Sequence, residues 1–173
     1  VFAADAPEHT VTSNVGFVSN YVFRGIAQTS TNPAVQGGMD YVHSSGLYAG
    51  VWGSNVSWIA DSGAVASGSV TMELDTYFGY RGSFAEGLGY DVGFVRYNYL
   101  GDYTAAAPLV KADTAEVYAA ISYKFLTAKY SHSVMNGFLT VPDSKGTNYI
   151  ELNASYTIPD TTYTVSAHVG KQT

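Results

Sequence analysis

The sequence predicts an all-β protein, an antiparallel up-and-down transmembrane β-barrel, from its alternating segments, its low charge and its many aromatic residues. The clearest alternating segment covers residues 70–80, where even positions carry Val, Met, Leu, Thr, Phe and Tyr, and odd positions include Glu73 and Asp75. Since successive strand side chains point to opposite faces, this segment has an apolar face and a charged face. A membrane barrel needs that division, because lipid covers one face and the lumen the other.

Composition favours the same class. Charged residues make up 13% of the 173 residues, whereas the surface of a soluble domain is about 25–35% charged. No run approaches the roughly 18–20 apolar residues of a transmembrane helix. Aromatic residues make up 14%, with 15 tyrosines, and many lie near predicted strand ends, as in the aromatic girdles of membrane barrels. Secreted Gly- and Tyr-rich sandwiches share this composition, so it does not decide the class alone.

Charge and cysteine content exclude other classes. The net charge of −6 argues against nucleic-acid binding through a basic patch. The absence of cysteine removes disulfides, thiolate catalysis and cysteine-based metal sites. Ala3 ends a stretch with the small residues that a signal peptidase accepts. We therefore expect residues 1–10 to be a signal-peptide remnant and N-terminal tail, residues 11–173 to form a single β-barrel domain, and the protein to reach the bacterial outer membrane through a cleaved signal peptide.

The first three strands are predicted at 11–26, 35–43 and 47–59. The first carries Val11, Val15 and Phe17 on one face, and it is followed by an Asn-Pro turn, because the residue before proline avoids the helical region. Ser44-Ser45-Gly46 forms a tight turn to the third strand. That strand carries apolar residues on both of its faces, so the sequence does not decide which face points outward.

Six further strands follow a small-residue loop at 60–68. They are predicted at 70–80, 88–99, 115–125, a segment ending near Met135, 148–158 and 163–170. The apolar phase of 88–99 shifts near 93–95, which predicts a β-bulge there. Long connections after the first, third, fifth and seventh strands alternate with short turns, as in outer-membrane barrels, although the first connection is only modestly long.

Nine strands are an odd count for a single-chain bacterial barrel, which closes with an even number. The sequence also stops at Thr173 without an aromatic terminal strand. We therefore expect the complete protein to have ten to twelve strands, with the C-terminal ones absent here.

If the apolar tracks face lipid, the charged residues face the lumen. The predicted lumen-lining residues are Arg24, Asp40, Glu73, Asp75, Arg81, Asp91, Glu116, Lys124, Lys129, Glu151 and His168. Acids and bases occur together, so a network that fills a narrow barrel is the first expectation, because buried charges need partners. A conduit for ions or small polar solutes is the second, since barrels of this size have little open lumen.

No motif indicates catalysis, and we expect neither an enzyme nor a cofactor. The four histidines are scattered without metal-ligand spacing. Two alternatives remain open: a secreted or periplasmic β-sandwich or lipocalin-like ligand-binding protein with inward apolar tracks, and an outer-membrane lipid-modifying hydrolase using Ser131 or Ser133 near His168. Expected partners are outer-membrane lipid and the barrel-assembly machinery, not nucleic acid; a homo-oligomer is left open.

Residues 14–29, together with 33–41 and 45–56, resemble the TorF-type porin family. These are small Gram-negative outer-membrane proteins, also catalogued as a conserved domain of unknown function. The similarity is specific over residues 14–56 and rests elsewhere on spacing, as at 73–77. The resemblance implies an outer-membrane barrel and longer members with more strands. It implies no substrate and no functional residues.

Overall fold

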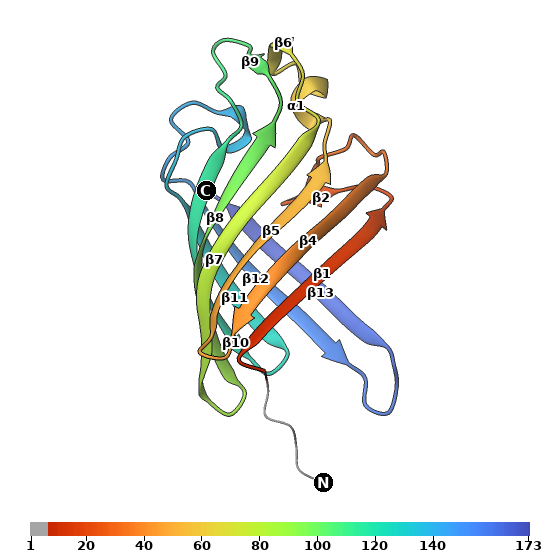
Figure 1. Cartoon of the computed structure of the whole chain (residues 1–173), viewed down its shortest axis with the longest axis vertical. Helices are drawn as coiled ribbons and strands as arrows, with labels where there is room; N and C mark the ends of the chain where they lie inside the picture. The colour runs from red at the N-terminus through yellow and green to blue at the C-terminus, as the bar shows by residue number, and fades with distance from the viewer. Residues whose placement is uncertain (1–6) are drawn as a thin grey trace.

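The computed structural model describes residues 7–173 and contains one large antiparallel sheet of nine strands (Figure 1). The strands are β1 (His9–Val18), β4 (Ala34–His43), β5 (Leu47–Asn55), β7 (Met72–Ala85), β8 (Leu88–Leu100), β10 (Thr114–Tyr123), β11 (Leu126–Ser133), β12 (Asn148–Thr157) and β13 (Thr164–Gln172). Each pairs with its sequence neighbours in the order β1-β4-β5-β7-β8-β10-β11-β12-β13. The all-β class and the antiparallel up-and-down order are therefore confirmed.

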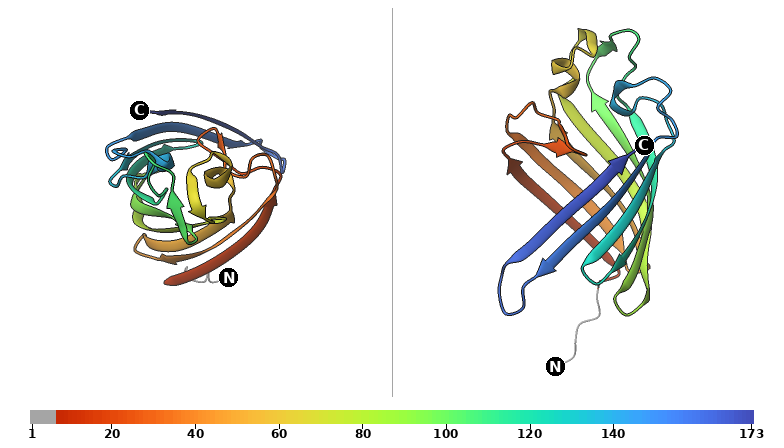
Figure 2. Two further views of the ribbon diagram at one scale, coloured as in Figure 1. Left: turned by 90° about the horizontal axis from the view of Figure 1, so that it is seen from above. Right: turned by 180° about the vertical axis from the view of Figure 1, so that it is seen from behind.

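The sheet curls around an interior, as the view from above in Figure 2 shows. Within residues 7–173, β1 pairs only with β4 and β13 only with β12, so the sheet has two free edges and is not closed into a barrel. Among these same residues, no helix has the length and apolarity that a helical membrane crossing requires. The predicted signal-peptide remnant lies largely outside the described residues, and β1 begins at His9.

Long and short connections lie at opposite ends of the sheet (Figure 1). The short turns are 44–46, 86–87, 124–125 and 158–163. The long connections carry β2 (Val22–Phe23) and β3 (Ile26–Ala27), then α1 (Trp58–Asp61) and β6 (Val65–Gly68), then β9 (Tyr103–Ala105), then the 3₁₀ turn η1 (Phe138–Thr140). The predicted alternation is confirmed, and the first connection, at 19–33, is longer than predicted.

The first strand ends at Val18, not at residue 26 as predicted. Arg24 and Gly25 have φ values of 47° and 83°, and they form the turn of a small hairpin in which Phe23 pairs with Ile26. Two consecutive residues with positive φ make the turn whose twist matches a β-hairpin. The apolar alternation therefore continues past Val18 on a separate unit, the β2–β3 hairpin.

The predicted β-bulge at 93–95 is wrong. β8 pairs without interruption with both β7 and β10 through these residues, and the irregularity lies between Ser83 and Ala85. The uninterrupted strand keeps Tyr97 on the face of Asp75 and turns Arg96 to the other face. There the Arg96 Nε donates to Asn98 Oδ1 at 2.7 Å, so these two polar side chains partner each other.

The conventional hydrophobic core is small and lies around the long connections rather than along the strands. It comprises Val56, Trp58, Ile59, Ala64, Val70, Tyr99, Tyr103 and Ala112. The predicted third strand stops at Asn55, and Trp58 and Ile59 belong to α1 instead. Trp58 packs edge-on against Tyr99 at a centroid distance of 5.7 Å. The long connections thus form a packed cap, while most apolar side chains of the strands lie outside this core.

Candidate functional site

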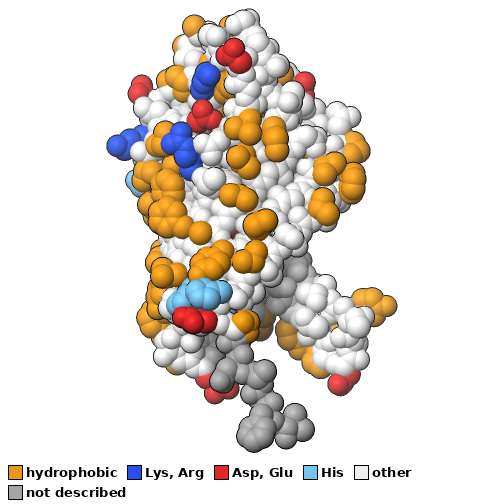
Figure 3. Space-filling model, viewed as in Figure 1, with side chains coloured by type: hydrophobic (Ala, Val, Ile, Leu, Met, Phe, Trp, Pro, Cys, Tyr) orange, Lys and Arg blue, Asp and Glu red, His pale blue; other side chains and the backbone are white. Residues whose placement is uncertain are grey.

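The burial of polar and apolar side chains on the two faces of the sheet is the reverse of that in a soluble protein. On the inner face, Glu73, Glu116 and Asp75 are only 1%, 2% and 8% exposed. On the outer face, Phe78 and Ile121 are 59% and 57% exposed. Figure 3 shows hydrophobic side chains spread over the outside of the strands, with few charged side chains among them. Acids are therefore buried while large apolar side chains are exposed.

Most of the predicted lumen-lining residues share this inner face. By strand register they are Asp40, Glu73, Asp75, Arg81, Asp91, Glu116, Lys129, Glu151 and His168. Arg24 reaches the same interior, but from the β2–β3 hairpin instead of a strand. The structure places Lys124 elsewhere, in the turn between β10 and β11, with a φ of 54°. Its Nζ lies 5.2 Å from the centroid of the Tyr123 ring.

Arg24 fixes the hairpin to the opposite side of the interior. Its two terminal nitrogens donate to the two carboxylate oxygens of Glu116, each at 2.7 Å. Its Nη1 also donates to Gln172 Oε1 at 3.1 Å, and its guanidinium lies 4.2 Å from the centroid of the Tyr149 ring. The planar guanidinium fork matches a carboxylate in this two-bond geometry. The hairpin is thereby held inside the curled sheet.

The same connection is attached to the cap at its other end. Gln28 accepts a backbone hydrogen bond from Ser57 at 2.9 Å, and the Ser30 hydroxyl donates to Asp61 Oδ2 at 2.5 Å. The hydrogen bonds from Ser30 and then Ser57 lower the pKa of Asp61 below its usual value. Both ends of the segment therefore have polar attachments, one in the interior and one at the cap.

A layer of tyrosines crosses the interior below the hairpin. The Tyr48 hydroxyl donates to Asp91 Oδ1 at 2.5 Å and also bonds the Tyr118 hydroxyl. The Tyr77 hydroxyl donates to Asp40 Oδ1 at 2.6 Å. These hydrogen bonds join side chains from five strands, as expected of a polar interior in which each buried group needs a partner.

Glycines on neighbouring strands make room for these rings. The Tyr77, Tyr48 and Tyr118 rings lie directly against Gly50, Gly79 and Gly93, respectively. A methyl group at residue 79 would lie 2.6 Å from the Val92 carbonyl oxygen, whereas one at Gly16 would meet nothing within 4 Å.

We expect Gly79→Ala to destabilise the protein by about 1–3 kcal/mol, the usual cost of overpacking a filled interior. Gly16→Ala is the matched control, also on the inner face, and should change stability by less than about 1 kcal/mol. Urea unfolding midpoints of the two variants, compared with the parent, measure both effects. Equal midpoints for Gly79→Ala and the parent would contradict the tyrosine packing.

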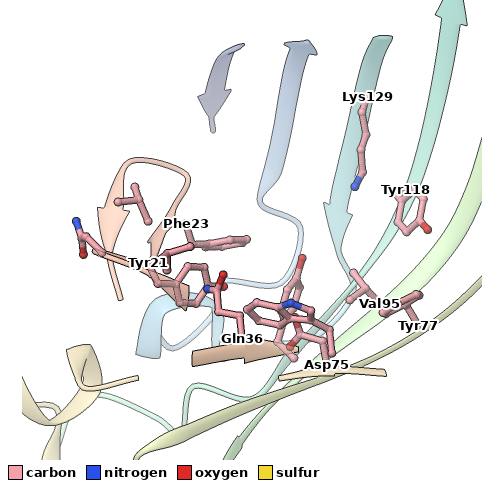
Figure 4. Close-up of a pocket in the computed structure, with 13 residues that line it drawn as sticks. Tyr21, Phe23, Gln36, Asp75, Tyr77, Val95, Tyr118 and Lys129 are labelled. Atoms are coloured by element: carbon pink, nitrogen blue, oxygen red, sulfur yellow. The ribbon is translucent and has the colours of Figure 1, made fainter. Parts of the chain in front are cut away.

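The interior contains several cavities, of which two adjoin each other. The first, of about 640 Å³, lies between the β2–β3 hairpin and strands β4 to β11, and Tyr21, Phe23, Asp75 and Tyr77 are among the residues around it (Figure 4). The second, of about 480 Å³, extends toward the short turns and is lined by Arg81, Asp91 and Ala120 among others. Tyr118 and Lys129 line both cavities, so they lie at the boundary between them. The Lys129 Nζ is 4.2 Å from the centroid of the Tyr118 ring.

Among residues 7–173, Glu8, His9 and His43 have ligand atoms close enough to hold a metal ion, all within 4.8 Å of one another. His9 and His43 are directly paired across β1 and β4, which sequence spacing alone did not reveal. The other two histidines are hydrogen-bonded side chains: His132 to Asn148 at 2.7 Å, and His168 to Asn153 at 2.7 Å. The three-residue group lies on the surface, outside both cavities.

The residues considered for a hydrolase are not brought together within the described chain. Ser133 is buried and donates to the Met135 carbonyl at 3.0 Å. His168 contacts the Tyr149 hydroxyl at 3.0 Å in addition to Asn153. Neither Ser131 nor Ser133 forms a hydrogen bond with His168 in residues 7–173. The nucleophile–base pairing that such an enzyme needs is therefore not formed there.

A family model described as a bacterial protein of unknown function, Gcw_chp, matches residues 3–173. This description names neither the TorF-type family nor a porin. No curated protein and no solved structure matches the chain. The match spans nearly all of the chain, and the protein therefore belongs to the Gcw_chp family of bacterial proteins.

Proposed function

We propose that this protein is a β-barrel of the bacterial outer membrane, and that its polar interior offers a restricted, porin-like path for ions or small polar solutes. The observation that carries this proposal is the inverted burial of the sheet. Glu73 and Glu116 are buried on the inner face, while Ile121, Ile150 and Leu152 are 57%, 58% and 46% exposed. This arrangement is favourable when hydrocarbon surrounds the outer face and polar groups fill the interior. In water, the exposed apolar side chains would be unfavourable.

Aromatic side chains near the short turns support the same proposal. Tyr80, Phe84, Tyr123, Tyr156 and Tyr163 are all exposed and lie in or beside the short-turn ends of their strands. Phe84 and Tyr90 pack together at a centroid distance of 4.6 Å. Amphipathic rings at this level match the aromatic girdle of a membrane barrel, where ring bodies meet lipid and hydroxyls meet the interface.

Two further features belong to the proposal. Closure of the β1 and β13 edges is part of it, because backbone groups left unpaired in lipid cost several kcal/mol each. The resemblance of residues 14–56 to the TorF-type family supports the outer-membrane barrel. The lipocalin-like alternative requires inward apolar tracks, and no observation favours it, because Met72, Leu152 and Ile158 are exposed.

Membrane insertion is tested by refolding the purified full chain with lipid vesicles, followed by flotation and carbonate washing. We expect the chain to float with the vesicles, to resist carbonate, and to migrate differently on gels before and after boiling. A chain that stays monodisperse in detergent-free buffer and does not float would contradict the proposal. Conductance in planar bilayers then tests the path, since discrete steps indicate a conduit and their absence indicates a filled structural barrel.

A further inference from the structure

The first interior cavity is walled by aromatic rings from the hairpin and from the sheet. Tyr21 meets Trp52 edge-on at a centroid distance of 5.4 Å, and Phe23 meets Tyr97 edge-on at 5.6 Å. All four rings line the cavity of about 640 Å³. This volume lies within the range of pockets that enclose small organic molecules. The hairpin therefore builds one wall of a chamber inside the curled sheet.

A buried acid lies in the wall of this chamber. Asp75 is among the residues that line it. The residue is 8% exposed, and its Oδ1 has no hydrogen-bond partner within residues 7–173. Glu73 lies two residues away on the same face. Its Oε1 accepts from the Tyr21 hydroxyl at 3.3 Å, while its Oε2 has no hydrogen-bond partner in the described part of the chain. Buried ionised groups are costly without a compensating charge or hydrogen bond.

The charge balance of the interior leaves an excess of acids. The inner acids are Asp40, Glu73, Asp75, Asp91, Glu116 and Glu151, against the bases Arg24, Arg81 and Lys129. Arg24 is already paired with Glu116. Among residues 7–173 the first cavity itself is lined by one acid, Asp75, and one base, Lys129, whose ammonium lies on the Tyr118 ring. Over the whole interior the acids outnumber the bases, and such an excess of one sign concentrates ions of the opposite sign. The interior as a whole therefore favours cations.

We propose that the chamber binds a small organic cation of the ammonium class, with Asp75 as its counter-charge and the surrounding rings as its cage. The inference deepens the proposed function, on which it rests, by naming the solute class. Ring faces attract ammonium groups through cation–π interactions, strongest with Trp and stronger still when water is excluded. A hard metal cation would need several oxygen ligands instead, and this wall offers mainly rings.

The probe is choline, titrated by calorimetry into the full chain folded in detergent. Its neutral isostere, 3,3-dimethylbutan-1-ol, has the same shape without the charge. We expect choline to bind and the isostere to bind at least about tenfold more weakly, because only the cation gains from the carboxylate and the ring quadrupoles. Equal binding of both compounds would overturn the proposal, since the chamber would then be only an apolar pocket.

Three variants locate the site. Asp75→Asn is expected to weaken choline binding about tenfold or more, and Trp52→Leu about three- to tenfold. Asp91→Asn is the matched control: it removes one inner-face charge outside this chamber, and its affinity should equal that of the parent. Each variant is first checked for heat-modifiable gel mobility, and the two chamber variants are independent tests if one fails to fold.

Two outcomes overturn the inference at this stage. If Asp91→Asn lowers the affinity for choline as much as Asp75→Asn does, choline is attracted by the overall charge of the interior and not by this site. If Asp75→Asn and Trp52→Leu both bind choline as the parent does, the chamber is not the binding site. The membrane proposal is judged separately. A chain that inserts into vesicles but binds no choline refutes only the chamber site, while one that binds choline but stays monodisperse without detergent refutes only the barrel.

Discussion

Glu116→Gln is expected to destabilise the folded protein by about 3–5 kcal/mol, the usual cost of removing one partner from a buried ion pair. Arg24 and Glu116 side chains are 10% and 2% exposed, and their shortest contact is 2.7 Å. Without the carboxylate, the guanidinium remains in the interior beside the neutral Gln172 amide and the rings of Tyr149, Phe23 and Phe138, with no anion hydrogen-bonded to it in residues 7–173. The β2–β3 hairpin should then leave the interior in a larger fraction of molecules.

The measurement is urea unfolding in detergent or vesicles, together with proteolysis at Arg24 as a readout of hairpin release. Glu151→Gln is the comparison variant, because it removes another inner-face carboxylate that forms no hydrogen bond with Arg24 in residues 7–173, although its charge acts on the guanidinium at longer range. We expect a loss below about 1 kcal/mol. The double variant Arg24→Met with Glu116→Gln should recover much of the loss, since no unpaired charge remains. A Glu116→Gln variant as stable and as protease-resistant as the parent would show that the ion pair does not hold the hairpin.

A charge placed on the outer face is expected to have the second-largest effect. Ala119 and Ala120 are neighbours in the middle of β10, the first exposed on the outer face and the second on the inner face beside the 480 Å³ cavity. Ala119→Arg should destabilise the vesicle-inserted protein by about 2–4 kcal/mol, the cost of arginine at the lipid-facing midplane of a barrel. Ala120→Arg should cost less, because its side chain can enter the cavity next to Asp91.

This matched pair separates the membrane barrel from a water-soluble sheet. If the outer face met water, Ala119→Arg would be a surface change worth less than about 0.5 kcal/mol, and Ala120→Arg would be the harmful one. The fraction of each variant that folds into vesicles, read from heat-modifiable mobility across a urea series, gives the comparison. A smaller loss for Ala119→Arg than for Ala120→Arg would contradict a lipid-facing outer surface.

The strands and their order could be predicted because they depend on local pattern. The alternation at 70–80 predicted a strand and its two faces, and β7 has both, with Glu73 and Asp75 buried. Turn signals such as Ser44-Ser45-Gly46 predicted short connections that the structure contains. In an up-and-down sheet each strand pairs with its sequence neighbour, so strand order follows directly from chain order.

The phase error at β8 shows where local pattern fails. The change in the apolar alternation from Phe94 to Val95, Tyr97 and Tyr99 predicts a bulge only if all of these residues share one face. The strand is uninterrupted there, and Tyr97 turns inward, where its hydroxyl lies 3.4 Å from Glu116 Oε2. A tyrosine suits either environment, because its ring is apolar and its hydroxyl is polar, so its type alone could not assign its face.

Local alternation, turn residues and low charge were thus sufficient for the all-β class, the order of the nine main strands and the face of the sheet on which the acids lie, because each depends on a few consecutive residues. Only the tertiary structure decided that residues 19–33 fold into the interior, since Arg24 meets a partner 92 positions away. It likewise decided the pairing of His9 with His43 and the chamber around Asp75. These features depend on strand register and on side chains from distant strands meeting across a curved sheet, which no local pattern encodes.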